Sequence, residues 1–309
     1  MKAAGVCLIR DAADMVPFLC GHYLRLGFDR LLFIDDNSAD GTFALLKQIA
    51  QLNEAIEVET VATASVQQPE KVSRAANTLI GRGYEIIFPF DSDEFWDIDL
   101  EAIRAEAKSA KYGLFLGQWV QFVQDGRQRR STLFGPLRAR NRAPVLPVSP
   151  DNIPDLSKQP FVCATFPKVA FVSANPVSVG LGQHFLVDGP QNIVMRDLEL
   201  FHLPVRSAAE IVARAQNAGR WLADAKPGQG WHTAQIRDLV AAGKADQVWK
   251  MNSADSNGQI DLGGDKIALI PDTRLRRLLF RALLFLTLRH PSFMVKAVSK
   301  SRRREPSAG

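Results

Sequence analysis

The sequence of 309 residues predicts an α/β protein with a mostly parallel central sheet flanked by helices. Two observations lead to this prediction. Short apolar runs at residues 4–9, 30–35, 56–60 and 85–90 have the character of buried strands, and amphipathic segments of helical periodicity separate them. Strands and helices that alternate in this way build βαβ units, whose right-handed crossovers produce a parallel sheet.

The helices of this first half follow from local signals. A first helix is expected over residues 15–26, with Asp14 as its N-cap and Pro17 in the first turn, where proline is tolerated. A turn and a second helix are expected within residues 38–50, and a third helix over residues 70–81. The last apolar run leads into the acidic stretch "FDSDEFWD" at residues 90–97.

The pattern changes after Lys111. A strand is predicted over residues 113–123, then an arginine-rich loop over 127–142 and a proline-punctuated stretch over 144–167. Short strands follow within 168–189 and 193–207, and helices are expected over 207–225 and 231–242. The sequence has no internal repeat.

Composition places the chain among ordinary globular proteins, with 46% hydrophobic and 23% charged residues. Its three cysteines have no spacing typical of a zinc site or a disulfide framework, which favours a reducing compartment. The first ten residues, "MKAAGVCLIR", resemble a strand more than a signal peptide. We therefore expect a cytoplasmic protein.

The basic charge is concentrated near the C-terminus. Residues 274–305 hold ten Lys/Arg and one acidic residue, so the remainder of the chain is net acidic although the total is +5. General nucleic-acid binding by the globular part is therefore not expected. Residues 272–300 form a long apolar and basic helical pattern, but its apolar core is too short to span a bilayer, which takes about 20 residues. We expect residues 272–304 to lie on an anionic membrane surface, which would make the protein peripheral at the inner face of the cell membrane. The alternative is a helix packed on the body, followed by a disordered end.

Polar motifs follow three of the predicted strands: Arg10-Asp11, Asp35-Asp36-Asn37-Ser38 and Asp91-Ser92-Asp93. In parallel sheets, ligands bind at the carboxyl ends of the strands. Solvated turns without function would fall equally at both ends of the strands. The coincidence therefore indicates a binding site.

Asp91 and Asp93 have the chemistry of a divalent metal site. Mg²⁺ and Mn²⁺ prefer carboxylate oxygens, and the small Ser92 between the two aspartates leaves room for a ligand. A metal there would neutralise a diphosphate and stabilise it as a leaving group. The alternative is a short acidic turn. Glu94 is a candidate to orient a metal ligand or a neighbouring helix.

The segment "IDDNSADGT" has two interpretations as well. Its polar residues make a good turn and helix cap. Alternatively, Asp35 or Asp36 accepts hydrogen bonds from a uracil ring NH or a ribose hydroxyl. The sequence contains neither GxGxxG nor GxxxxGK[ST], which counts against dinucleotide enzymes and P-loop NTPases.

Taken together and in order, these motifs resemble those of the family-2-like glycosyltransferases of the GT-A fold, in the branch of bacterial polysaccharide glycosyltransferases related to family 92. The resemblance covers roughly residues 4–220. It rests on the N-terminal region through "DDNSADGT", on "DSDEF", on Gly182-Gln183-His184, and on the segment from His202 to Ser207. Ala12 and Leu203 depart from the family pattern, which often has an acidic residue and a tyrosine there.

The resemblance implies a nucleotide-sugar donor, often UDP-linked, and a divalent metal, Mn²⁺ or Mg²⁺. Asp93 would be the main metal ligand, Asp91 would touch ribose or metal, and His184 would complete the metal site. His202 and Arg206 would face the diphosphate or the acceptor. On the donor side we also place Arg10, Asp35, Asp36 and Lys168.

A catalytic base is needed if the enzyme inverts the anomeric centre, because a carboxylate must then deprotonate the acceptor hydroxyl. Asp188 is the first candidate and Asp155 the second. The acceptor would be a glycan or a lipid-linked sugar, and the arginine-rich loop is a candidate contact for an acidic one.

The predicted organisation is a glycosyltransferase domain over 1–225, with a nucleotide-binding half (1–110) and an acceptor and metal half (111–225). A helical and loop extension (226–271) and a basic amphipathic helix with its tail (272–309) follow. Two other functions remain open: a metal-dependent nucleotidyltransferase or phosphohydrolase, and an inactive module that binds nucleotide sugar or glycan.

Overall fold

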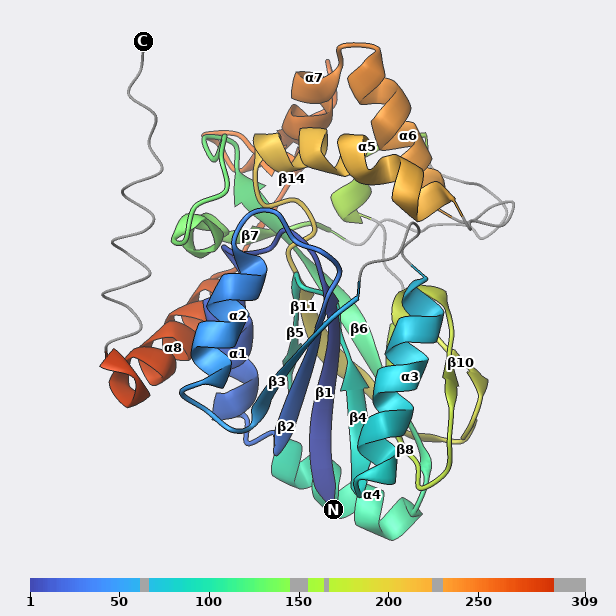
Figure 1. The fold of residues 1–309 in the computed structure, drawn as a ribbon. Coiled ribbons are helices and arrows are strands. Elements are labelled where there is room, and N and C mark those ends of the chain that lie inside the picture. Colours follow the sequence, from blue (N-terminus) through green and yellow to red (C-terminus); the bar gives the residue numbers. More distant parts are fainter. Residues whose placement is uncertain (62–66, 145–154, 164–166, 224–229, 292–309) are drawn as a thin grey trace.

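The computed structural model describes residues 1–61, 67–144, 155–163, 167–223 and 230–291 (Figure 1). Its strands are β1 (Lys2–Ile9), β2 (Arg30–Asp35), β3 (Ile56–Thr60), β4 (Tyr84–Pro89), β5 (Glu94–Asp97), β6 (Gly113–Asp125), β7 (Asn141–Arg142), β8 (Pro167–Val172), β9 (Ser178–Val179), β10 (Leu186–Asp188), β11 (Ile193–His202), β12 (Ser253–Ala254), β13 (Gln259–Asp261), β14 (Lys266–Ala268) and β15 (Ile270–Pro271). Its α-helices are α1 (Val16–Arg25), α2 (Thr42–Ala50), α3 (Gln68–Gly81), α4 (Leu100–Ala110), α5 (Ala208–Leu222), α6 (Trp231–Ala241), α7 (Ala245–Lys250) and α8 (Arg274–Arg289).

The predicted fold class is confirmed. The strands β3, β2, β1 and β4 lie side by side and are all parallel. The sheet continues through the antiparallel strand β8 to β6, and β11 pairs with β6 in parallel. The carboxyl ends of β1, β2, β4 and β11 therefore lie along one edge of the sheet, together with the first residues of β8. We call this the carboxyl edge.

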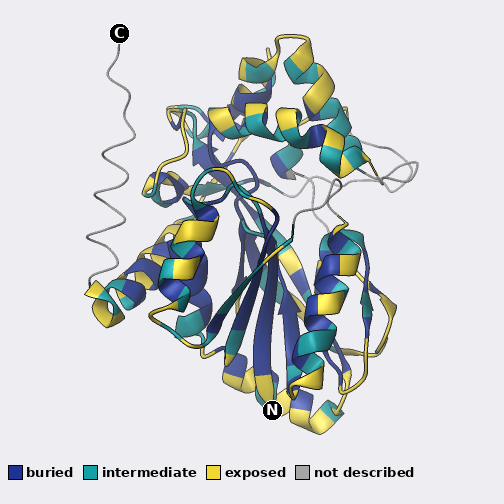
Figure 2. Ribbon diagram, viewed as in Figure 1, coloured by how far each residue is buried: buried dark blue, intermediate teal, exposed yellow. Residues whose placement is uncertain are grey.

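Helices cover both faces of the sheet (Figures 1 and 2). Because side chains alternate between faces along a strand, β1 sends Ala3 and Cys7 into one apolar cluster and Ala4 and Val6 into the other. The first cluster includes buried residues of α1, α2, α4 and α8. The second includes residues of α3 and of the β9–β10 hairpin. β1 thus lies in the middle of a two-sided core.

A third apolar cluster lies beyond the carboxyl edge. Figure 1 shows α5, α6 and α7 above the ends of the parallel strands, and their buried residues include Ile211, Ile236 and Trp249. Residues after 230 also return to the sheet, since β12 pairs with β6 and β15 pairs with β7. This part of the chain covers the carboxyl edge.

Two local expectations are corrected. The N-cap of α1 is Met15, not Asp14, and no side chain caps that helix. Asp14 instead forms an ion pair with Arg206, because a guanidinium compensates a buried carboxylate better than backbone amides alone. The acidic stretch is also more regular than expected, since Glu94 begins β5, which pairs with β11.

The C-terminal helix begins two residues later than expected, at Arg274, and packs against α1. The Cβ that an alanine would add at Gly21 would lie 2.1 Å from the carbonyl oxygen of Ala282, so only glycine permits this approach. No helix in the described ranges is both long enough and apolar enough to cross a membrane. The expected tail beyond residue 291 lies outside the described residues.

Candidate active site

The motifs that follow β2 and β4 are linked by the first turns of α3. Gln68 and Lys71 of this helix are three residues apart and therefore share a face. The Gln68 amide donates to Asp91 at 3.0 Å, and the Lys71 ammonium donates to Asp36 at 2.9 Å. The structure thus brings together the strand-end carboxylates that the sequence predicts to share a site.

Asp36 is surrounded by cations. Its buried carboxylate pairs with Lys71 and with Arg220 of α5, at 2.9 Å each. Arg10, which follows β1, donates to the Asp36 backbone oxygen at 2.6 Å. We call Asp36, Arg10, Lys71 and Arg220 the Asp36 group. Three cations meet at one carboxylate, which favours an anionic ligand at this position.

Asp35 differs from its neighbour. One carboxylate oxygen, Oδ2, accepts a hydrogen bond from the Ser38 amide at 3.1 Å. The other, Oδ1, is buried and has no hydrogen-bond partner among the described residues. Leaving a buried acceptor unsatisfied costs about 1–3 kcal/mol, so a donor from a ligand would be favoured there.

Asp91 is held by three side chains. Its Oδ2 lies 2.6 Å from the Lys168 ammonium, while Oδ1 accepts from the amides of Gln68 and Gln183 at 3.0 and 3.1 Å. Lys168 is almost completely buried and also lies 3.1 Å from Glu94. Burial alone would lower the pKa of Lys168, but Asp91 and Glu94 raise it well above its ordinary value.

Glu94 closes the acidic turn. Its carboxylate accepts from the Asp91 amide at 2.9 Å, and its own amide donates to the Asp91 carbonyl at 3.1 Å. Burial raises the pKa of Glu94, and Lys168 opposes this effect only in part. Through these contacts Glu94 fixes the geometry of the turn that carries Asp91 and Asp93.

Asp93 faces a different set of partners. Its carboxylate lies 3.5 Å from His202 Nε2 and 3.3 Å from Arg214 of α5. Burial alone would raise the pKa of Asp93, but His202, Arg214 and Arg206 together hold it well below its usual range. Asp93 is therefore ionised at neutral pH.

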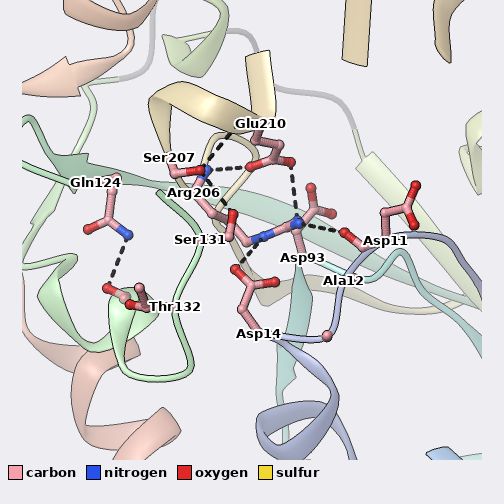
Figure 3. Close-up of polar contacts among 12 residues, drawn as sticks. Asp11, Ala12, Asp14, Asp93, Gln124, Ser131, Thr132, Arg206, Ser207 and Glu210 are labelled. Atoms are coloured by element: carbon pink, nitrogen blue, oxygen red, sulfur yellow. Dashed lines mark hydrogen bonds and ion pairs between the residues drawn. The ribbon is translucent and has the colours of Figure 1, made fainter. Parts of the chain in front are cut away.

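Arg206 is the buried centre of a second set of ion pairs (Figure 3). It pairs with Asp14 at 3.1 Å and with Glu210 at 3.2 Å, and it donates to the Asp11 carbonyl at 3.4 Å. The N-cap of α5 is Ser207, whose hydroxyl accepts from the Glu210 amide. Arg206 thus anchors the start of α5 to the loop after β1, which places Arg214 and Arg220 over the carboxyl edge.

Trp119 of β6 contacts both the Glu94–Lys168 pair and the two histidines of the predicted site. Its indole donates to Glu94 at 2.8 Å, and the Lys168 ammonium lies 5.6 Å from its ring centroid. His202 stacks on the ring at 4.4 Å, and His184 meets the ring edge at 5.5 Å. Both histidines of the predicted site therefore lie beside one indole.

The Gly182-x-His184 motif has a clear local reason. Gly182 has a φ of 66°, which favours glycine, and a Cβ there would lie 2.6 Å from His184 Nε2. The Pro167 carbonyl lies 2.7 Å from His184 Nδ1. Because a carbonyl only accepts, Nδ1 carries the proton and Nε2 carries the lone pair. Burial lowers the pKa of His184 to about 4, so the imidazole is neutral at pH 7.

The predicted metal can be tested against these residues. Carboxylate oxygen and neutral imidazole suit Mn²⁺, and His184 has the tautomer and the orienting carbonyl typical of a metal-bound histidine. Asp91 and Asp93 alike have both carboxylate oxygens paired with protein groups, Asp91 with Lys168, Gln68 and Gln183, and Asp93 with His202 and Arg214. Within the described ranges, no three His, Cys, Asp or Glu side chains are arranged to hold a metal ion. The carboxylates of Asp91 and Asp93 and the neutral imidazole of His184 have the donor chemistry that the predicted metal needs, but the described side chains alone do not form a complete metal site.

Charge balance points to the same side of the site. Around Asp93 and Lys168, five carboxyl groups face only three cations: Asp14, Asp91, Asp93, Glu94 and Glu210 against Lys168, Arg206 and Arg214. The Asp36 group has the opposite imbalance, because its three cations face two carboxylates, Asp36 and Asp11, which pairs with Arg10 at 3.4 Å. A positive ligand component is therefore favoured near Asp93, and a negative one near Asp36.

The two candidate bases are both exposed carboxylates. Asp188 ends β10 and is exposed, and Asp155 is an exposed residue that caps its own turn and pairs with Lys158 at 3.5 Å. No hydrogen bond or ion pair described for this chain links either to the site. In the arginine-rich loop, Arg127 pairs with Asp125 and Arg129 with Asp246.

Sequence reasoning missed Lys71, Trp119, Arg214 and Arg220. One signal was available for α5: Glu210, Arg214 and Asn217 recur at helical spacing, a polar stripe on a helix that also has an apolar face. Lys71 and Trp119 had no such signal, because each resembles an ordinary helix or strand residue.

Comparisons with known proteins give low similarity. No protein-family model matches the chain, and no curated sequence does. Among solved structures, S. aureus TarS has 10% identity and a TM-score of 0.37 over 77% of this chain and 44% of that one. The structure of TarS 1-349 has 10% identity and a TM-score of 0.36, covering 97% and 92%. HddC from Yersinia pseudotuberculosis has 10% identity and a TM-score of 0.35, covering 66% and 95%. The chain spans less than half the length of the longer TarS structure, and the functional argument below rests on the site itself.

Proposed function

We propose that this protein is a glycosyltransferase that moves a sugar from a nucleotide-sugar donor, with UDP as the expected nucleotide, to a glycan or lipid-linked acceptor. The supporting observation is the arrangement at the carboxyl edge. Three features lie along it in order. The first is the buried Asp35 oxygen without a partner among the described residues, the second is the Asp36 group with its three cations, and the third is Asp93 with its acidic neighbours and two imidazoles. These features match the base or ribose, the diphosphate and the cation of a bound nucleotide sugar.

Asp35 is the proposed contact for the nucleoside. Its Oδ1 has no partner among the described residues and would accept from the uracil ring NH or a ribose hydroxyl. Asp36 is less suited to this role, because Lys71 and Arg220 already occupy its carboxylate. On this basis we favour Asp35 over Asp36 as the nucleoside contact, a choice that the sequence left open.

The diphosphate is proposed to bind at the Asp36 group. The side chains of Arg10 and Arg220 are each 23% exposed, so their guanidinium groups are fixed by protein contacts yet reachable by a ligand. Guanidinium groups form paired hydrogen bonds with phosphate oxygens. Charge that develops on the departing diphosphate would be stabilised there, which is the main electrostatic contribution expected for this transfer.

The divalent cation is proposed to bind at Asp93 together with the donor diphosphate, and His184 is proposed to complete its ligands. When bound, Mn²⁺ or Mg²⁺ supplies Lewis-acid stabilisation of the diphosphate. Asp91 stays a predicted contact of the metal or the ribose, and we propose that it is also a positioning residue. It fixes Lys168, Gln68 and Gln183, and through them the turn that presents Asp93.

The acceptor side has fewer indications. Asp188 remains the first candidate for the base that takes the acceptor proton, because it is an exposed carboxylate four residues after His184. Asp155 remains the second candidate. A retained transfer activity in Asp188→Asn would exclude Asp188.

Calorimetry with UDP, with and without Mn²⁺, tests the donor site. We expect Mn²⁺-dependent binding in the native protein and binding weakened about tenfold or more in Asp35→Asn, since a hydrogen bond to a charged group contributes about 1.5–3 kcal/mol. Asp238→Asn is the matched control, because Asp238 is exposed and outside the site. Equal UDP affinity in all three proteins would refute the assignment of Asp35.

Product analysis then separates the alternatives. Incubation with UDP-sugars and candidate acceptors should release UDP only when a sugar is transferred. Nucleotide turnover without a glycoside product would favour the nucleotidyltransferase or phosphohydrolase, and binding without turnover would favour the inactive module.

A further inference from the structure

The C-terminal helix α8 has two opposite apolar faces. The inner face packs on the body through Leu275, Leu278, Leu279, Ala282, Leu283 and Leu286, all of which are buried. The close contact between Gly21 and Ala282 belongs to this face. The helix is therefore an integral part of the fold, and its inner side needs no further partner.

The outer face is also apolar but is uncovered. Phe280, Leu284 and Leu288 are 59%, 45% and 71% exposed. At a spacing of four residues they form a single row, and on a helix of 3.6 residues per turn this row lies opposite the buried leucines. In Figure 2, α8 shows exposed colour along its outer side. Three large apolar side chains in one row on a surface helix mark a binding face.

The charges beside this row all have the same sign. The helix contains five arginines and no acidic residue. Arg274 is compensated by Asp272 and Glu199. The other four, Arg276, Arg277, Arg281 and Arg289, are exposed, and none forms an ion pair with a residue that the structure describes. The face therefore combines apolar anchors with uncompensated positive charge.

We propose that the outer face of α8 docks in the plane of an anionic lipid bilayer. Phe280, Leu284 and Leu288 would enter the boundary between headgroups and acyl chains, and the arginines would contact the lipid phosphates. A helix of 16 residues is about 24 Å long, which suits this orientation and not a span.

A second copy of the chain is a poorer partner for this face. Two copies related by symmetry would bring the four uncompensated arginines of each helix against one another, and this repulsion opposes association. An anionic bilayer presents the complementary charge instead. The sequence after residue 291 adds five Lys/Arg and one acidic residue, which favours the same partner.

The sequence alone allowed either a membrane helix or a helix packed on the body. The structure shows that the two interpretations concern different faces of α8. The inner face meets the expectation of packing, and the proposal assigns the outer face to the membrane.

Sedimentation of the full chain with vesicles tests the proposal. The vesicles are phosphatidylcholine alone, or phosphatidylcholine with 30% phosphatidylglycerol. We expect binding only to the anionic vesicles, at least about a tenfold loss in Phe280→Ser/Leu284→Ser/Leu288→Ser, and about a fivefold loss for each arginine replaced in Arg277→Gln/Arg281→Gln. The substituted residues are exposed, so the fold is retained, which circular dichroism and the unfolding midpoint verify.

Matched controls remove similar groups elsewhere. Tyr112 and Val187 are 60% and 68% exposed and lie outside α8, so Tyr112→Ser/Val187→Ser should bind vesicles like the native chain. Native-like binding by the triple serine variant would overturn the proposal. So would the absence of native binding to anionic vesicles. A dimer in ultracentrifugation that the triple variant dissociates, without vesicle binding, would assign the face to a second copy and also overturn it.

Discussion

Gly182→Ala tests whether the orientation of His184 matters for ligand binding. The added Cβ would lie 2.6 Å from both Cδ2 and Nε2 of the imidazole, well inside ordinary contact distance, so the ring has to move. It would then lose the 2.7 Å hydrogen bond from Nδ1 to the Pro167 carbonyl. The backbone contributes a second cost of about 1–2 kcal/mol, because φ at this position is 66°.

The two costs can be separated by a control. Gly243 has a φ of 75°, and a Cβ there would meet nothing within 4 Å, so Gly243→Ala carries the backbone cost without the displaced imidazole. Both variants should lose about 1–2 kcal/mol of unfolding free energy from the backbone. Only Gly182→Ala should also lose the hydrogen bond, about 0.5–1.5 kcal/mol, and weaken Mn²⁺ binding about 10- to 100-fold.

The assay is calorimetric titration of Mn²⁺ into each protein in the presence of UDP, with urea unfolding of the same samples. If Gly182→Ala binds Mn²⁺ as tightly as Gly243→Ala, the argument that His184 is a metal ligand held by a carbonyl is refuted. The stability difference between the two variants then reports only on local packing.

Two further predictions concern stability. Gly21→Ala should cost about 1–3 kcal/mol of unfolding free energy in urea, because its Cβ would overlap the Ala282 carbonyl. Gly219→Ala, with nothing within 4 Å of its Cβ, should be neutral or stabilising. Equal unfolding midpoints of the two variants would contradict the close packing of α1 and α8. Asp93→Asn should cost about 1.5–3 kcal/mol at pH 7, since the folded state lowers the pKa of Asp93 below its unfolded value. That contribution is present above the unfolded pKa, about 3.9, and is lost as the pH falls toward the folded pKa. The difference in unfolding free energy between Asp93→Asn and the native protein should therefore be smaller at pH 3.5 than at pH 7. A gap that stays constant between pH 7 and pH 3.5 would show that ionised Asp93 is not the source of the stability.

Much of the fold could be predicted from the sequence because its signals are local. The strands β1 to β4 are apolar runs bounded by turn residues, and α1 to α3 have clear periodicity between them. β5 was not predictable in this way. It is only four residues long, and its pairing partner β11 lies about a hundred residues further along the chain. Short strands of this kind depend on tertiary contacts.

The same distinction between local signals and tertiary contacts applies to the site. Strand-end carboxylates and the Gly182-x-His184 motif are visible as local patterns. The pairing of these groups is not visible in this way: Lys168, 77 residues after Asp91, reaches its carboxylate from β8. Asp14 likewise follows the local rule for an N-cap but pairs instead with Arg206, 192 residues away. Ion pairs of this range follow from topology, which local spacing does not encode.

The glycine contact between α1 and α8 also bears on how the protein would meet its acceptor. A lipid anchor on a loose linker lets an enzyme turn freely above the membrane. A helix locked against the fold does not, so adsorption through α8 would hold the proposed donor site at one fixed tilt and height over the headgroups. Acceptors carried at that height would be favoured over longer or shorter ones, and the reach of the enzyme would be set by the rigid body of the protein.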